Sequence, residues 1–273
     1  MTTTGHDELA TPFDEPVRTF ATPGPLTVSP DDPPHEVARR LDERGVSAAL
    51  VAGADGQFCG VVSTTDLLRT LPAVGGDEGA PPARAVGEIM RAPVVSVGPD
   101  APLREAAALM VRHRIHRVFV AEGGRAAAVL TTYDLMRAVL RARLDLPLGA
   151  VMSAPVTVDV GEPIADALRR LERANVRGLV VVDGTWPVGV FTHTEALRTR
   201  RLPPPFLASP VEQVMSYETI CADVKTPLYR VAGHVVQMNV RRVLAVEGRE
   251  LRGVASGFDL ARVVAGGGAA GAP

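Results

Sequence analysis

The sequence predicts an α/β fold built from four copies of one unit, each with the element order β-α-β-β-α. Two observations carry this prediction. A seven-residue element returns four times, at 60–66, 128–134, 189–195 and 253–259, and each copy is a short apolar strand followed by a hydroxyl residue and, three positions later, an acid. A proline precedes each of these acids by 32 or 33 positions. Because this spacing covers nearly the whole chain, repetition is its organising feature.

Each unit is expected to begin with a short strand, after which the proline starts a helix, since proline is well tolerated at the first helical positions. Apolar residues four and eight positions after the proline share one helix face. A central strand follows, and a turn containing Gly or Asp joins it to the repeated strand. The central strands are predicted at 48–51, 117–120, 178–182 and 242–246, and the helices after the motif at 66–70, 134–144, 195–201 and 259–264.

Units of roughly 50 to 60 residues are small for independent stability, so neighbouring units should share a core. Their predicted bounds are about 17–71, 86–145, 146–201 and 210–265. The stretches 71–86 and 202–210 are rich in Gly, Pro or Ala and are interpreted as linkers.

The ends and the approaches to the units show further patterns. Residues 1–16 are predicted to be a flexible N-terminus and 266–273 a disordered tail. Three units follow a similar lead-in that contains Met90, Met152 or Met215, and the first unit shows no such lead-in.

Composition argues against several classes of protein. The net charge of −2 gives no bulk attraction to nucleic acid or to an anionic membrane. The most apolar stretch, 179–191, is interrupted by Asp183, Gly184 and Pro187, so no membrane insertion is expected. The two cysteines have neither disulfide nor metal-ligand spacing, and no apolar signal segment stands near the start. We therefore expect a cytoplasmic protein without a metal site.

With this unit and its G-h-h-[ST]-x-x-D element in hand, residues 17 to 265 resemble the CBS-domain family, named after the regulatory domain of cystathionine β-synthase. In that family two consecutive units pair through their sheets as a Bateman module, and clefts between units bind adenosine derivatives. The resemblance implies two Bateman modules, at about 17–145 and 146–265. It implies a regulatory ligand such as AMP, ADP, ATP or S-adenosylmethionine. It also implies self-association into a flat disc, formed by one chain alone or by a homodimer.

The motif itself offers groups that suit such a ligand. An ionised acid accepts both hydroxyls of a ribose, and a hydroxyl beside the free N–H groups of a helix start receives phosphate. The candidate ribose acceptors are Asp66, Asp134, Glu195 and Asp259. The candidate phosphate-binding hydroxyls are Ser63, Thr131, Thr192 and Ser256. The same pattern is also a helix capping box, in which both side chains only satisfy the helix's own first N–H groups.

Basic residues at the start of the central strands favour the ligand-binding interpretation. The CBS family often places residues that face the ligand phosphate at this point. The resemblance therefore implies this role for His116, Arg117, Arg177, Arg241 and Arg242. The first unit has Ser47 and Ala48 there instead. The copies ending at Asp134 and Asp259 combine acid, hydroxyl and basic residues, and they are the preferred sites.

We therefore expect an adenosine-ligand sensor whose module packing changes on binding and is detected by a partner, such as an enzyme or a transporter. The alternative is a ligand-independent scaffold for dimerisation or docking, in which the motif acids only cap helices. An enzyme is not expected, because the sequence contains no P-loop and no catalytic Ser-His-Asp or Cys-His arrangement in a motif context.

Overall fold

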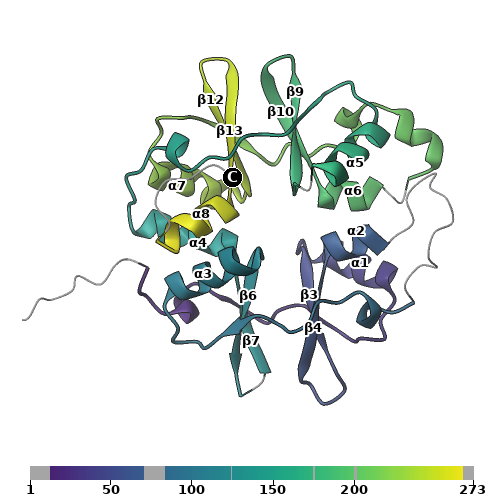
Figure 1. The fold of residues 1–273 in the computed structure, drawn as a ribbon, viewed down its shortest axis with the longest axis vertical. Coiled ribbons are helices and arrows are strands. Elements are labelled where there is room, and N and C mark those ends of the chain that lie inside the picture. The colour runs from purple at the N-terminus through teal and green to yellow at the C-terminus, as the bar shows by residue number, and fades with distance from the viewer. Residues whose placement is uncertain (1–12, 71–83, 124, 175, 200–201, 267–273) are drawn as a thin grey trace, which may run out of the picture.

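Four small sheets surrounded by helices form a ring in the computed structural model, which describes residues 13–70, 84–123, 125–174, 176–199 and 202–266 (Figure 1). In every sheet a short first strand pairs in parallel with a central strand, which pairs antiparallel with the strand of the repeated motif. The predicted α/β fold of four β-α-β-β-α units is therefore confirmed.

The first pair of units occupies residues up to Arg141. Unit 1 contains β2 (Thr27–Val28), α1 (Pro34–Glu43), β3 (Ala48–Ala52), β4 (Phe58–Ser63) and α2 (Thr64–Thr70). Unit 2 contains β5 (Ser96–Val97), α3 (Leu103–His113), β6 (Arg117–Glu122), β7 (Arg125–Thr131) and α4 (Thr132–Arg141).

The second pair repeats this order. Unit 3 contains β8 (Thr157–Asp159), α5 (Ile164–Arg173), β9 (Gly178–Asp183), β10 (Trp186–Thr192) and α6 (His193–Thr199). Unit 4 contains β11 (Ile220–Asp223), α7 (Leu228–Met238), β12 (Arg242–Glu247), β13 (Glu250–Ser256) and α8 (Gly257–Val264).

Local sequence explains where the first helix of each unit begins and which face it buries. The repeated proline lies at the N-cap of all four of these helices, where its missing N–H costs no helical hydrogen bond. In α1 the predicted apolar positions Val37 and Leu41 are 0% and 1% exposed. The helices therefore follow the proline register and pack their apolar faces into the core.

A lead-in before each unit crosses to the other unit of its pair. Each begins with a single 3-10 turn: η1 (Val17–Thr19), η2 (Val86–Glu88), η3 (Leu148–Ala150) and η5 (Val211–Gln213). The expectation that the first unit has no lead-in is wrong, because η1 is followed by β1 (Thr22–Pro23), which pairs with β7. This lead-in was not recognised in the sequence, because Ala21 occupies the place that methionine takes in the other three.

The lead-ins are exchanged reciprocally within each pair of units. Thr22 of the first lead-in pairs with Val129 of unit 2, and Arg91 of the second pairs with Val61 of unit 1. Likewise the third lead-in pairs with β13 of unit 4, and the fourth with β10 of unit 3. Units 1 and 2 therefore form one Bateman module, and units 3 and 4 form the other.

The two modules join through their helices, and the ring closes within one chain. Helix α4 packs against α7 and α8, α3 packs against α8, and α2 packs against α6. One large apolar core consequently spans units 2 and 4, and another spans units 1 and 3. Figure 1 shows the helices meeting across the middle while the strand hairpins point to opposite ends. Of the two disc arrangements left open by the sequence, the chain adopts the one that needs no second copy.

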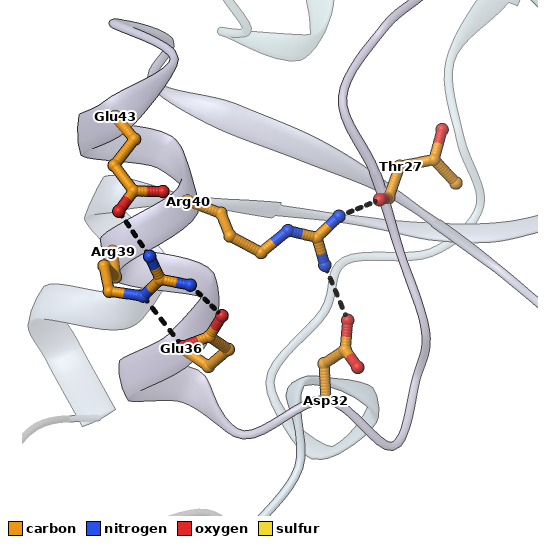
Figure 2. A network of polar contacts seen from close by, with 6 residues as sticks. All are labelled: Thr27, Asp32, Glu36, Arg39, Arg40 and Glu43. Atoms are coloured by element: carbon orange, nitrogen blue, oxygen red, sulfur yellow. Dashed lines mark hydrogen bonds and ion pairs between the residues drawn. The ribbon is translucent and has the colours of Figure 1, made fainter.

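Polar contacts tie the first helix of unit 1 to its first strand (Figure 2). Arg40 donates to the Thr27 carbonyl over 2.8 Å and to Asp32 Oδ2 over 3.0 Å, while Arg39 lies on the exposed side between Glu36 and Glu43. Unit 3 repeats the first pattern, since Arg170 donates to the Thr157 carbonyl and to Glu162, each over 3.0 Å. The repeat therefore extends to individual polar contacts.

Some segments differ from their predicted character. Residues 13–16 were expected to be flexible, but the carbonyls of Phe13 and Glu15 accept hydrogen bonds from Arg104 and Leu103 at the start of α3. The second linker forms a 3-10 helix, η4 (Pro204–Ala208), and buries Leu207. The predictions for 1–12, for most of the first linker (71–83) and for 267–273 lie outside the described residues. In the described part of the chain, no helix has the length and apolar character needed to cross a membrane.

Candidate functional site

The four motif acids lie at equivalent junctions, where the last strand of each unit turns into its second helix. Each acid is nearly buried: Asp66 and Glu195 are 7% exposed, and Asp134 and Asp259 are 5% exposed. Burying a carboxylate is costly unless hydrogen bonds or positive charge compensate it. The hydrogen bonds and cations already at each carboxylate oxygen therefore decide whether that oxygen is available to a ligand.

One oxygen of each acid is used to cap its own helix. Asp134 Oδ2 accepts from the backbone N–H of Thr131 over 2.8 Å and from the Thr131 hydroxyl over 2.7 Å. Asp259 Oδ2 accepts equivalent bonds from Ser256, both 2.8 Å long. Asp66 pairs with Ser63 and Glu195 with Thr192 in the same way. The capping box weighed from the sequence is therefore formed, with the acid and hydroxyl of every motif in contact.

The second oxygen distinguishes the three aspartates. Asp66 Oδ1 accepts from Arg91 Nε over 2.7 Å, and Asp259 Oδ1 accepts from the Ser153 hydroxyl over 2.6 Å. Asp134 Oδ1 accepts no hydrogen bond from another side chain of the described residues, and the guanidinium of Arg137 lies 3.9 Å from it. Burial raises the pKa of Asp134 despite its two bonds from Thr131. Asp134 thus has the most available oxygen of the three aspartates.

The predicted basic residues of units 2, 3 and 4 lie near one another, and two of them contact unit 1. Arg117 of unit 2 donates to the hydroxyl of Ser47 in unit 1 over 2.6 Å. Arg241 of unit 4 donates to the carbonyl of Gly45 in unit 1 over 3.1 Å. Arg242 donates to the carbonyl of Arg177 in unit 3 over 3.3 Å. Unit 1 lacks its own basic pair, and it receives guanidinium groups from units 2 and 4.

The basic cluster consists of His116, Arg117, Arg177, Arg241 and Arg242, and the carboxylates of Glu195 and Asp66 act electrostatically on Arg242 and Arg177. Among the described residues, no carboxylate forms an ion pair with Arg117, Arg177, Arg241 or Arg242. Burial, and then the charges of Arg177 and Arg241, lower the pKa of Arg117 to about 10. Burial, and then the charges of Arg177, Arg117 and Arg242, lower the pKa of His116 to about 3. An anion in this place would relieve the mutual repulsion of the cations.

Sequence reasoning missed His193 as a member of this cluster. Its Nδ1 lies 3.0 Å from the Thr65 hydroxyl of unit 1, and burial followed by the charge of Arg177 lowers its pKa to about 4. The signal was its place directly after the motif hydroxyl Thr192. Phe258, which directly precedes the motif acid Asp259, lies with its ring centroid 5.2 Å from that of His116.

Metal binding finds no support in the part of the chain that the structure describes. No group of three or more His, Cys, Asp or Glu side chains lies close enough there to hold an ion. The candidate site combines acids and arginines with His116 and His193, and its acids and arginines suit an organic anion with hydroxyl groups.

Curated relatives cover this chain broadly but are themselves uncharacterised. Protein MJ1404 of Methanocaldococcus jannaschii is 24% identical over 93% of the chain. A 33.4 kDa protein from a ribosomal RNA operon of Thermofilum pendens is 28% identical over 63% of the chain. The matches span 62% of the length of each of these relatives.

Solved structures share the whole architecture. Protein MJ1225 of Methanocaldococcus jannaschii, a proposed archaeal homolog of g-AMPK, matches with a TM-score of 0.77 at 18% identity, over 91% of this chain and 99% of that one. A conserved protein from Pyrococcus horikoshii matches with a TM-score of 0.64 at 22% identity, over the same shares of the two chains. At these identities the similarity establishes the four-unit fold.

The family model for the CBS domain matches three stretches, 17–73, 86–141 and 148–201, which together make up more than half of the chain. They coincide with units 1, 2 and 3, and unit 4 repeats the same strand topology in β11, β12 and β13. The chain belongs to the CBS-domain family.

Proposed function

We propose that this protein is a regulatory sensor of an adenosine-type ligand, which binds in the clefts between CBS units with its phosphate toward the basic cluster and its ribose toward a motif acid. The observation that carries the proposal is the cluster itself. Guanidinium groups from three units converge there, and among the described residues none of them forms an ion pair with a carboxylate. Holding them together costs electrostatic free energy, which a phosphate would repay by charge-assisted hydrogen bonds.

Signalling follows if the ligand prefers one packing of the units. Arg117, Arg241 and Arg242 each bridge two units, so an anion that draws them inward acts on the contacts between units. A ligand shifts such an equilibrium only by its differential affinity for the two arrangements. An enzyme or transporter partner would then detect the change, which agrees with the regulatory character of CBS domains and with the description of MJ1225 as a homolog of g-AMPK.

Equilibrium titration with AMP, ADP, ATP, S-adenosylmethionine and adenosine tests this proposal. We expect AMP to bind at least tenfold more tightly than adenosine, because only AMP carries the phosphate. The double substitution Arg241→Gln and Arg242→Gln should remove most of that difference while adenosine binding changes little. Arg39→Gln, on the outer side of α1, is the matched control. Absence of binding by all five compounds at millimolar concentration would overturn the proposal.

A ligand-independent scaffold is the second candidate, and the capping boxes favour it. All four acids satisfy their own helix starts, which is a complete structural role. In that case Asp134→Ala and Asp259→Ala would each lower stability by about 1 kcal/mol and change no ligand affinity.

Homodimerisation and a cytoplasmic location remain parts of the proposal that need their own measurements. Since the helices of the two modules already pack together within the chain, a homodimer would have to use a different surface. Light scattering on the purified protein, with and without nucleotide, gives the assembly state directly.

A further inference from the structure

The residue that pairs with each motif strand from the exchanged lead-in occupies the same place four times. It is the next residue in the sequence after Ala21 or the lead-in methionine. Ala21 and the three methionines are equivalent because the N–H of each donates to the carbonyl of the first residue of its 3-10 turn. The four residues are Thr22, Arg91, Ser153 and Ser216, which pair with Val129, Val61, Val254 and Val190. Two of them, Arg91 and Ser153, bond directly to the acid of the unit they reach. Three copies therefore have a short hydroxyl side chain at this place, and one has an arginine.

Arg91 neutralises Asp66 at this place. Its Nε donates to Asp66 Oδ1 over 2.7 Å, while Oδ2 is taken by the backbone N–H of Ser63 over 3.0 Å and by the Ser63 hydroxyl. The Asp66 side chain is 7% exposed and that of Arg91 is 61% exposed. The guanidinium consequently stands between the carboxylate and the solvent, and both oxygens of the acid are used within the protein.

A hydroxyl in the same place has a different effect. Ser153 also bonds to its acid, Asp259, but a hydroxyl is neutral and is both donor and acceptor, so it can share the carboxylate with a ligand hydroxyl. A guanidinium only donates, and its bond to a carboxylate is charge-assisted. A neutral ribose hydroxyl forms a weaker bond to the same oxygen, so it does not displace Arg91.

We propose that Arg91 is a built-in occupant of the ribose position of unit 1, and that it removes Asp66 from ligand binding. The inference rests on the proposed function and specifies which clefts serve it. Unit 1 has no basic pair of its own, since Ser47 and Ala48 start its central strand, and the guanidinium groups of Arg117 and Arg241 that reach it come from other units. Arg91 thus makes the number of ligand sites smaller than the number of repeats, although the motif of unit 1 is intact.

Adenosine is the suitable probe, because without a phosphate its affinity does not depend on the loss of a cation. The test substitution is Arg91→Ser, which introduces the residue found in two of the equivalent places. By titration calorimetry we expect Arg91→Ser to bind one more equivalent of adenosine than the wild type. The further substitution Asp66→Asn in the same chain should abolish that gain. Arg39→Ser, which removes an exposed arginine of α1, should leave the stoichiometry unchanged.

The converse substitution gives an independent check. Ser153→Arg places a guanidinium against Asp259, and we expect it to remove one equivalent of adenosine. Thermal unfolding of each variant shows whether the fold is retained.

The outcomes separate this inference from the proposed function. If the wild type binds AMP and Arg91→Ser gains no site, the inference is overturned and the sensor function stands. A gain that survives Asp66→Asn lies elsewhere and also overturns the inference, as does the loss of a site, which would mean that Arg91 itself holds the ligand. If neither protein binds any adenosine compound, the inference and the function both fail.

Discussion

At the scale of single residues, Asp134 illustrates how one carboxylate serves structure and candidate binding together. Its Oδ2 caps α4 through Thr131, and the guanidinium of Arg137 lies 3.9 Å from its Oδ1, which accepts no hydrogen bond from another described side chain. The cap gives the carboxylate a structural role, and the second oxygen is the one proposed to accept from a ribose hydroxyl. The two roles are therefore compatible. A substitution separates them, because loss of the cap lowers stability and loss of the ribose contact lowers affinity.

Asp134→Ala is expected to affect both roles. Loss of the cap should lower the free energy of unfolding by about 1 kcal/mol, as found when helix caps are removed. Loss of a charge-assisted bond to ribose should weaken adenosine binding roughly ten- to a hundredfold. Urea denaturation and titration calorimetry measure the two effects. A stability loss with unchanged affinity would leave Asp134 a cap alone.

His116 gives the molecule a dependence on pH. Its pKa falls from 6.5 to about 3 in the folded protein, while the unfolded chain titrates near 6.5. The unfolded state therefore binds the proton first as the pH drops, and stability is lost between about pH 6.5 and pH 3. We expect His116→Asn to reduce this acid destabilisation, measured as the unfolding midpoint in urea against pH. His35→Asn on the exposed face of α1 serves as the control, and an equal effect of both changes would contradict the assignment.

At the scale of elements, each lead-in packs against its receiving strand by matching residue sizes. A Cβ on Gly60 would lie 2.4 Å from Met90 Sδ, and one on Gly253 would lie 2.5 Å from Met152 Sδ. Unit 2 has Ala128 at the glycine position, and its incoming lead-in has Ala21 at the methionine position. The departure from glycine in unit 2 thus accompanies a smaller side chain at the facing position.

A double-mutant cycle at Gly60 and Met90 tests this matching. Gly60→Ala alone should destabilise the protein by about 1 to 3 kcal/mol, the usual effect of overpacking. Adding Met90→Ala reproduces the pair of alanines in unit 2 and should cost less than the sum of the single changes. Strict additivity in urea denaturation would show that the two positions do not compete for space. Gly98→Ala is the control, because a Cβ there meets nothing within 4 Å.

The repeat predicted most of the elements but not their exchange. Proline register and apolar spacing are local properties, so α1, α3, α5 and α7 could be inferred from them. The crossing of the lead-ins depends on contacts between distant segments, and the first lead-in was missed because Ala21 carries no methionine signal. The acids and hydroxyls were likewise found from local spacing. The bond of Arg91 to Asp66 joins two units, and no spacing within either unit indicates it.

At the scale of the whole molecule, Gly257 lets units 2 and 4 approach each other. A Cβ there would lie 2.5 Å from Thr132 Oγ1 and 2.9 Å from the Thr132 carbonyl oxygen. A glycine at the start of a helix would by itself only make the turn more flexible. The structure instead places it where the first turns of α8 and α4 meet, so its lack of a side chain serves the joining of the modules.

Gly257→Ala therefore has an expected sign opposite to that of helix propensity. In an isolated helix alanine is more favourable than glycine by roughly 1 kcal/mol. Here the clash with the Thr132 backbone should dominate and lower the unfolding free energy by about 1 to 3 kcal/mol. Urea denaturation gives the sign of the change in unfolding free energy. A stabilised protein would show that the contact between α4 and α8 has room for an added methyl group.

The reciprocal lead-ins also constrain how such a chain changes in evolution. The last strand of each unit pairs with a lead-in segment that precedes the other unit of its pair in the chain. Deleting one unit alone would leave its former companion without the strand it receives, and would leave one segment with nowhere to pair. Gain or loss by whole pairs avoids both defects. Duplication of a whole pair of units therefore keeps every lead-in paired with a strand, and it yields a chain of four units such as this one.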